Sequence, residues 1–187
     1  MTTVAREKIT INPKELKARL GGADDSASRE FADSVADEIL SVMNCSYILK
    51  KTDISFTANG CNLGFGNIES VNLRRNLTGC GSAYVLAATI GHDVDRALRN
   101  ASLVSTAKHF VLDAVASSAV EALCDYIQGS LPEKTKARFA PGYGDFNLEM
   151  QGKLLEFLEA HKIGISVNDS FMMTPMKTIT AIMGIKL

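Results

Sequence analysis

The sequence predicts a single α+β domain, because helical and strand patterns follow one another in mixed order instead of in repeated strand–helix–strand units. Its longest helical pattern, from about Val104 to Gln128, is apolar around most of its circumference, which indicates a central helix. The run Ala83 to Thr89 is almost entirely apolar and has the length of a strand, which indicates a strand buried on both faces. We expect several shorter helices and a mixed or antiparallel sheet to complete the core.

Two helices and then strands are predicted in the N-terminal third. A short helix over 12–20 starts with Asn12-Pro13 and ends at Gly21-Gly22, since proline suits a first turn and glycine the position after a last one. Apolar residues at helical spacing predict a second helix from Ser28, a candidate N-cap, to about Met43. The region 45–67 predicts strands joined by turns. Its strand-like runs are 47–49 and 54–56, and glycines stand at 60, 64 and 66.

The rest of the chain predicts three more helices around the central pattern and a tail of strands. A helix over 67–77 ends at Thr78-Gly79. Another begins at His92, because acidic residues in a first turn are stabilised by the positive end of the helix dipole. A further helix is expected from about 147 to 160. Three short strands follow in the tail, at 163–167, 171–173 and 179–185.

Composition and charge favour a globular protein of the cytoplasm. The 187 residues carry a net charge of -1, so they lack the basic excess that would neutralise nucleic-acid phosphates. No apolar run has the length of a membrane span or of a secretory signal, so we expect neither membrane contact nor secretion. Cys45, Cys61, Cys80 and Cys124 are scattered without a C-x-x-C pair, which favours reduced thiols.

The motifs of the common enzyme classes are missing from the sequence. It has no phosphate-binding loop, dinucleotide fingerprint, zinc-protease motif or serine-hydrolase motif. His92, His109 and His161 lie far apart and lack the spacing of metal ligands, so no metal site is expected. The remaining candidates are polar residues in apolar or irregular surroundings.

One segment, RFAPGYGD, combines a cation, a turn and an aromatic ring. Arg138 offers a planar fork that suits a carboxylate. Pro141 biases Ala140 toward extended backbone, which leaves the Ala140 amide and carbonyl free for polar contacts, and Gly142 allows close approach to a ligand. Tyr143 adds a ring for stacking or for cation–π contact. The segment therefore predicts part of a binding site for a carboxylate.

Glu121 is the second candidate, because a carboxylate inside an apolar helix requires a cation or hydrogen bonds. Each candidate has a structural alternative. In the first alternative, Arg138 and Asp145 form an ion pair within their own loop. In the other, Glu121 lies on the solvated edge of its helix with residues at helical spacing. Those residues are Asp113, Ser117 and Asp125.

Taken together, these segments resemble the activation domain of cobalamin-dependent methionine synthase. RFAPGYGD, preceded by AVEALCDYI and followed by SFMMTPMKTITAI, matches the family signature of an Arg, three residues and then Gly-Tyr. LTGCGSAYVLAATIGHDVDRAL is similar to a segment of the short, free-standing members. The match covers about Ser70 to Ile185. On this resemblance, 1–187 is one activation-like domain, with 1–66 as its N-terminal part and 67–187 as the core of the match.

The resemblance implies a site for S-adenosylmethionine (AdoMet) and no catalytic residue in this chain. It assigns the AdoMet carboxylate to Arg138, the cationic end to Glu121, backbone contacts to Ala140 and the groove wall to Tyr143, and it counts Gly142 of the motif among the ligand-binding residues. The expected role is that of an accessory reactivation subunit, which supplies the methyl group for reductive remethylation of cob(II)alamin. The cobalamin is expected on a separate corrinoid protein or methionine synthase subunit, with a flavodoxin-like reductant as a further partner.

Two further hypotheses belong to other functional classes. Long members of the family continue past the KTITAI-like strand, whereas this sequence ends at Leu187, and they carry an acidic N-terminal contact for which Asp53 is the position to examine. The second hypothesis is therefore a module that docks on or caps a corrinoid protein without binding AdoMet. The third is an oligomerisation domain without a ligand.

Overall fold

The computed structural model describes residues 1–21 and 26–186, without the side chains of 26–30, 32 and 33. Its helices are α1 (Pro13–Arg19), α2 (Ser26–Val42), α3 (Val71–Leu77), α4 (His92–Val104), α5 (Thr106–Gly129) and α6 (Met150–Leu158), with short 3-10 turns η1 (Arg6–Lys8) and η2 (Ala160–Ile163). Its strands are β1 (Thr2–Val4), β2 (Cys45–Phe56), β3 (Gly60–Leu63), β4 (Gly66–Glu69), β5 (Ser82–Thr89), β6 (Ser166–Val167), β7 (Met173–Thr174) and β8 (Thr178–Gly184).

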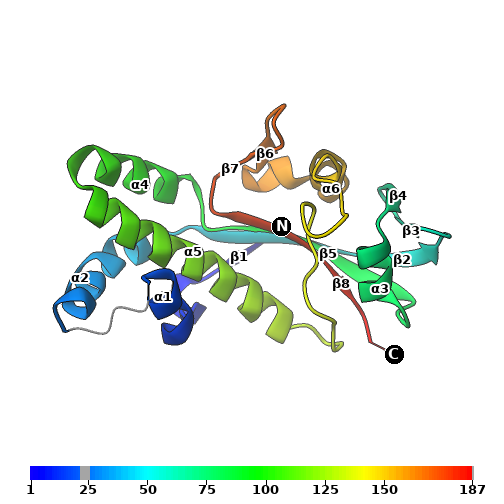
Figure 1. Ribbon diagram of the computed structural model, residues 1–187, viewed down its shortest axis with the longest axis horizontal. Helices are drawn as coiled ribbons and strands as arrows, with labels where there is room; N and C mark the ends of the chain where they lie inside the picture. Colours follow the sequence, from blue (N-terminus) through cyan, green and yellow to red (C-terminus); the bar gives the residue numbers. More distant parts are fainter. Residues whose placement is uncertain (22–25, 187) are drawn as a thin grey trace.

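The fold is α+β, as predicted, and consists of an antiparallel sheet between two layers of helices (Figure 1). The strand order is β4-β3-β2-β5-β8, with β1 added beside β2, while β6 and β7 form a separate pair. In the described residues every strand pairing is antiparallel. Helices α1, α2, α4 and α5 cover one face of the sheet, and α3 and α6 cover the other.

Strand β5 lies between β2 and β8 and is buried on both faces, which confirms the prediction for the run from Ala83. Its side chains alternate between two apolar cores, because successive residues of a strand point to opposite faces. Leu86 belongs to the core under α5, whereas Val85 belongs to the core under α6. One continuous apolar strand thereby joins both layers.

Helix α5 is the central helix that the sequence predicts, with half of its residues buried against α1, α2, α4 and the sheet. It begins at Thr106 and not at Val104, because Ser105 has extended backbone and its side chain accepts a hydrogen bond from the Lys108 amide at 3.2 Å. Val104 instead ends α4. The side chain of Ser105 therefore divides two helices where the apolar pattern alone suggests an early start.

Other predicted boundaries needed correction as well. Helix α1 begins and ends as expected, although Gly22 lies outside the described residues. Helix α2 begins at Ser26, so the proposed cap Ser28 lies inside it. The runs 47–49 and 54–56 belong to one strand, β2, because its first part pairs with β5 and its end pairs with β3. Residues 67–69 form part of β4, so the helix predicted from 67 is α3 and starts at Val71.

The helix and strands of the C-terminal half are present as predicted, but the helix and the first two strands are shorter than the predicted ranges. The helix expected over 147–160 is α6, and the residues after it form the 3-10 turn η2. All three predicted tail strands are present, but the first two pair only with each other and the third, β8, completes the main sheet. No helix in the described part of the chain is long and apolar enough to cross a membrane.

The four cysteines are free and buried, as the sequence predicts for reduced thiols. Burial raises the pKa of Cys45 and of Cys61 to about 11 and that of Cys124 to about 12. Because the thiolate is the reactive form, burial makes these three thiols poor nucleophiles at neutral pH.

The hairpin of β3 and β4 leaves no room for a side chain at Gly60, where an added Cβ would lie 1.9 Å from the Ile68 carbonyl oxygen. We predict that Gly60→Ala destabilises the protein by about 2 kcal/mol or more, because the two strands must separate. Gly152→Ala in α6 is the matched control, since its Cβ would meet nothing within 4 Å. It should stabilise the protein by about 0.5–1 kcal/mol. Urea unfolding measures both, and equal effects would contradict the prediction.

Candidate functional site

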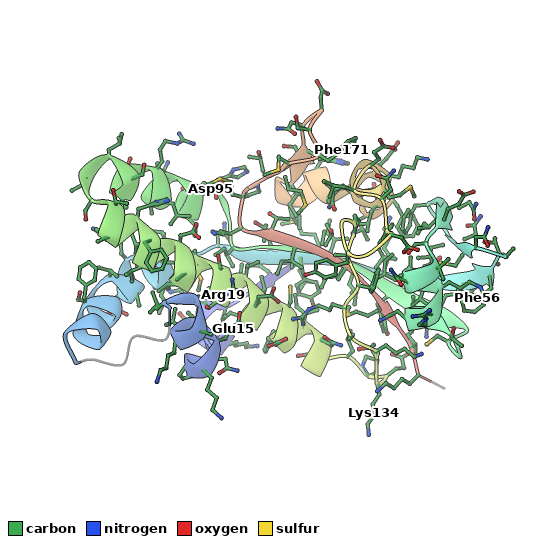
Figure 2. All side chains as sticks on the ribbon, in the orientation of Figure 1. Glu15, Arg19, Phe56, Asp95, Lys134 and Phe171 are labelled. Carbon is green, nitrogen blue, oxygen red and sulfur yellow. The ribbon has the colours of Figure 1, made fainter. Side chains whose placement is uncertain are left out.

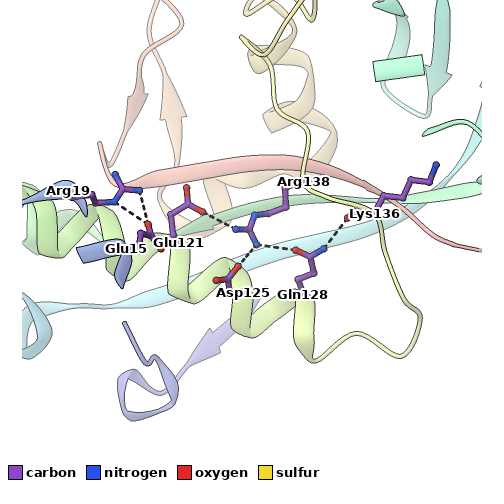
Figure 3. A network of polar contacts seen from close by, with 7 residues as sticks. All are labelled: Glu15, Arg19, Glu121, Asp125, Gln128, Lys136 and Arg138. Carbon is purple, nitrogen blue, oxygen red and sulfur yellow. Dashed lines mark hydrogen bonds and ion pairs between the residues drawn. The ribbon is translucent and has the colours of Figure 1, made fainter. Parts of the chain in front are cut away.

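Arg138 is held by three acceptors that project from α5 (Figure 3). Its Nη1 donates to Asp125 Oδ1 at 2.8 Å and to Gln128 Oε1 at 3.1 Å. Its Nη2 donates to Glu121 Oε2 at 2.9 Å. The Arg138 side chain is only 21% exposed. The two candidate residues of the sequence analysis, Glu121 and Arg138, are therefore neighbours.

The structure agrees in part with both interpretations of Glu121, as a residue paired with a cation and as a residue on the solvated edge of its helix. Glu121 does lie on one edge of α5 with residues spaced by four, so the helical spacing was interpreted correctly. That edge faces two cations and not only solvent, because Arg138 pairs with Glu121 and Asp125, and Lys177 pairs with Asp113. Ser117, the remaining residue of the row, accepts a hydrogen bond from Lys177.

The acids around Arg138 stabilise its charge. Partial burial disfavours the guanidinium ion, but the hydrogen bond to Asp125 and the charges of Asp125 and Glu121 outweigh it and raise the pKa of Arg138. A guanidinium has five N–H donors, of which three have the partners given above. Two donors therefore remain without a partner among the described residues, and two is the number that a carboxylate engages in a bidentate pair.

The backbone before the turn fixes where Arg138 points. Phe139 pairs with Ile182 at the outer edge of β8 through two hydrogen bonds of 2.8 and 3.0 Å. Because neighbouring side chains of an extended segment point in opposite directions, Phe139 packs toward the α6 core while Arg138 reaches toward α5. The strand edge thus positions the guanidinium.

The turn itself differs in one respect from the prediction. Gly142 has a φ of 90°, a left-handed value that suits glycine. The Ala140 carbonyl is not free, since it accepts a hydrogen bond from the Tyr143 amide at 3.1 Å. Tyr143 is 57% exposed, and its ring meets the Phe139 ring edge-on at 6.1 Å. The Tyr143 ring is therefore largely exposed and makes one perpendicular contact, with Phe139.

Asp145 does not pair with Arg138, so that structural alternative was wrong. Its carboxylate instead accepts hydrogen bonds at the start of α3, from the Ser70 hydroxyl and from the Val71 amide at 2.8 Å. The Asn72 amide donates to the same group at 3.2 Å. Asp145 therefore anchors the end of RFAPGYGD to the start of α3. Arg138 pairs with acids of α5 instead.

A groove of about 680 Å³ opens beside Arg138, a size typical of small-molecule sites. Its walls come from α5, RFAPGYGD, the start of α6, the loop from β6 to β8, and β8 itself. The described lining residues are Glu121, Asp125, Gln128, Ala137, Arg138, Ala140, Pro141, Tyr143, Leu148, Gln151, Phe171, Met172, Met173, Met176, Thr178, Ile179, Thr180 and Ala181. Gly142, one of the expected ligand-binding residues, is not among them.

The floor of the groove includes an open strand edge. Ile182 directs its amide and carbonyl outward to Phe139, so Thr180, two residues earlier, also directs its backbone groups away from β5. The Thr180 side chain is buried and bonded to Gln151 of α6 at 2.9 Å. The groove lining thereby includes a residue, Thr180, whose backbone amide and carbonyl point away from the sheet.

The wall opposite RFAPGYGD is tied to α4 and α5. Lys177 donates to Asp113 Oδ1 at 2.7 Å and to Ser117 Oγ at 2.9 Å, and the Met176 amide donates to Asp95 Oδ2 at 2.9 Å. Phe171 projects from the loop between β6 and β7 (Figure 2) and has a left-handed φ of 60°. These contacts hold the Phe171 to Met176 wall beside the helix that supplies Glu121.

The groove combines charged and apolar side chains. Its described lining contains no histidine or cysteine, and the thiol of Cys124 on α5 has a pKa raised to about 12 by burial. In the described residues no three His, Cys, Asp or Glu side chains gather to hold a metal ion. What the groove does hold is a cation with two available donors, two carboxylates and an apolar wall.

Sequence reasoning did not assign Asp125, Gln128 or Lys177 to the site. Asp125 and Gln128 follow Glu121 at i+4 and i+7, so helical spacing already places them on the same face. Nothing local marks Lys177 as a partner of α5. Asp53 lies in β2 opposite Ser82 and does not line the groove.

The ion pair of Lys177 generates a stability prediction. Its side chain is only 14% exposed, so Lys177→Met removes two partly buried hydrogen bonds and leaves Asp113 without its cation. We expect a loss of about 1–2 kcal/mol in urea unfolding. Lys162→Met is the control, because Lys162 pairs with Glu159 at the surface. Its effect should stay within about 0.5 kcal/mol, and a similar loss in both variants would refute a special role for Lys177.

The anchor at Asp145 generates a pH prediction. Hydrogen bonds from Ser70, Asn72 and Val71 hold the pKa of Asp145 below its ordinary value. A carboxyl with a lowered folded-state pKa contributes stability above its unfolded pKa of about 4 and loses that contribution as the pH falls below it. Asp145→Asn should therefore lower the melting temperature at pH 7 and lower it less at pH 3. Asp169→Asn, at an exposed acid, should change neither value.

Comparison with known proteins gives a match only at the level of structure. No protein-family model matches the sequence, and no curated protein matches it. A solved structure, described as the crystal structure of the MetH reactivation domain bound to AdoHcy, superimposes with a TM-score of 0.78. The match covers 98% of this chain and 77% of the other chain, with 13% sequence identity. The chain therefore has the fold of the MetH reactivation domain, as the resemblance in its sequence predicts.

Proposed function

We propose that this chain is an AdoMet-binding reactivation domain, which supplies the methyl group for reductive remethylation of a corrinoid carried by a partner protein. The observation that supports it best is Arg138, held at the groove by α5 with two donors still available. A structural neighbour with the same fold is described as bound to AdoHcy, the demethylated form of AdoMet. The domain organisation predicted from the sequence, one activation-like unit over 1–187, is part of this proposal.

The groove residues fit the chemistry of the ligand. AdoMet carries a carboxylate, an ammonium group and a sulfonium, so it needs a fork donor, a carboxylate and an aromatic face. Arg138 would hold the carboxylate through its two available donors, and Glu121 would accept the ammonium group. Ala140 would contribute its amide, Gly142 the shape of the turn, and Tyr143 an exposed ring beside the sulfonium.

The protein's contribution to the reaction is orientation. AdoMet supplies an electrophilic methyl group, and the acceptor is the reduced cobalt of the partner's corrinoid. Such a step needs no general base, so the side chains of this chain would only bind and orient the ligand. Arg138 and Glu121 fix one end of the ligand, while the Phe171 to Met176 wall covers the other.

Calorimetric titration of AdoMet into the purified protein tests the proposal. We expect binding at millimolar concentrations or below, and at least a tenfold loss with Arg138→Lys, which keeps the charge and removes the planar fork. Arg96→Lys is the matched control, because Arg96 forms an exposed pair with Asp93 on α4. The proposal fails if wild type shows no binding or if Arg138→Lys binds like wild type.

A second candidate function is the docking or capping of a corrinoid protein without AdoMet. The observation that favours it is the exposed apolar rim of the groove, where Tyr143 is 57%, Met172 63% and Met176 59% exposed. Retention of a corrinoid protein by this chain, unchanged in Arg138→Lys and without AdoMet binding, would support this candidate over the first.

A further inference from the structure

The negative charges that line the groove outnumber the positive charges. Its described lining contains two carboxylates, Glu121 and Asp125, and one cation, Arg138, so its formal charge is -2 + 1 = -1. Lys177 does not compensate for this, because it lies outside the lining and is bonded to Asp113 and Ser117. The groove therefore carries one negative charge more than its own ion pairs require.

Asp125 is the source of this excess charge. Glu121 is the less exposed of the two acids, 31% against 65%, and its pair already neutralises Arg138. Gln128 shares Nη1 with Asp125, so a neutral acceptor remains on the same nitrogen. Asp125 also borders a neighbouring hollow with Lys134 and Lys186, but its ion pair within the described residues is with Arg138 alone.

We propose that Asp125 determines specificity for the methylated ligand by charge, an inference that rests on the proposed function. AdoMet carries a net charge of +1, from its sulfonium, ammonium and carboxylate. Transfer of the methyl group to the partner's corrinoid would break the S–CH₃ bond, whose electron pair would stay on sulfur, and the electron pair of the acceptor would form the new bond to the methyl carbon. The product, AdoHcy, is a neutral thioether with a net charge of 0. A groove of charge -1 attracts the substrate and releases the product.

The size of this preference follows from the exposure of Asp125. Because solvent screens an exposed carboxylate, its charge changes the affinity of a monocation by about two- to fivefold. The preference should fall at high ionic strength, since salt screens exposed charges. A neutral ligand gains nothing from Asp125, so its affinity should not depend on this carboxylate.

The test compares three ligands by calorimetry: AdoMet, AdoHcy and sinefungin, which has a protonated amine in place of the sulfonium. Wild type should bind AdoMet and sinefungin more tightly than AdoHcy by at least twofold at low salt, and this ratio should fall as the salt concentration is raised. Asp125→Asn should reduce the ratio about two- to fivefold by weakening the charged ligands alone. Asp93→Asn, at an exposed acid of α4, should leave the ratio unchanged.

The outcomes separate this inference from the proposed function. If none of the three ligands binds, the proposed function fails. If all three bind with equal affinity to wild type, or if the ratio is independent of salt, charge selection is refuted while AdoMet binding stands. If Asp125→Asn weakens AdoHcy as much as AdoMet, Asp125 positions Arg138 and does not select by charge. The salt series uses wild type alone, so it tests charge selection even if the Asp125→Asn protein folds poorly.

Discussion

The hydrogen bonds between Arg138 and α5 are the interaction on which the groove depends. Phe139 pairs with the edge of β8, and its neighbour Arg138 reaches α5 from that edge. The guanidinium therefore connects the sheet, the central helix and the RFAPGYGD turn at one point. Because its acceptors hold it before any ligand arrives, a carboxylate would meet a preorganised fork, and binding would not carry the entropic cost of ordering a free arginine.

One edge of α5 serves two cations in different ways. Lys177 uses Asp113 and Ser117 to anchor the wall of the groove, and little of its side chain is exposed. Arg138 uses the next two acids of the same edge but keeps two donors for another partner. The difference follows from geometry, since an ammonium is a compact point charge whereas a guanidinium is a fork with donors on several sides. The same row of residues thus anchors the groove wall and orients the guanidinium of Arg138.

Much of the fold was predictable because it rests on local patterns. Short stretches of sequence predict the apolar run of β5, the caps of α1 and the apolar circumference of α5. Boundaries were less predictable where a distant partner decides them: residues 67–69 carry no strong strand pattern but pair with β3. Asp145 likewise finds its partners at Ser70 and Val71, which are 75 and 74 residues away in the chain.

For the site, the sequence by itself determined the residue types: an arginine before a Pro-Gly turn, a tyrosine after it and a glutamate in an apolar helix. Their resemblance to a known family also indicated AdoMet. Only the tertiary structure decided that Glu121 and Arg138 meet, that Asp125 and Gln128 join them, and that Lys177 closes the wall. The reason is that helical spacing orders residues along one element, whereas the distance between α5 and the edge of β8 depends on how both pack against the sheet.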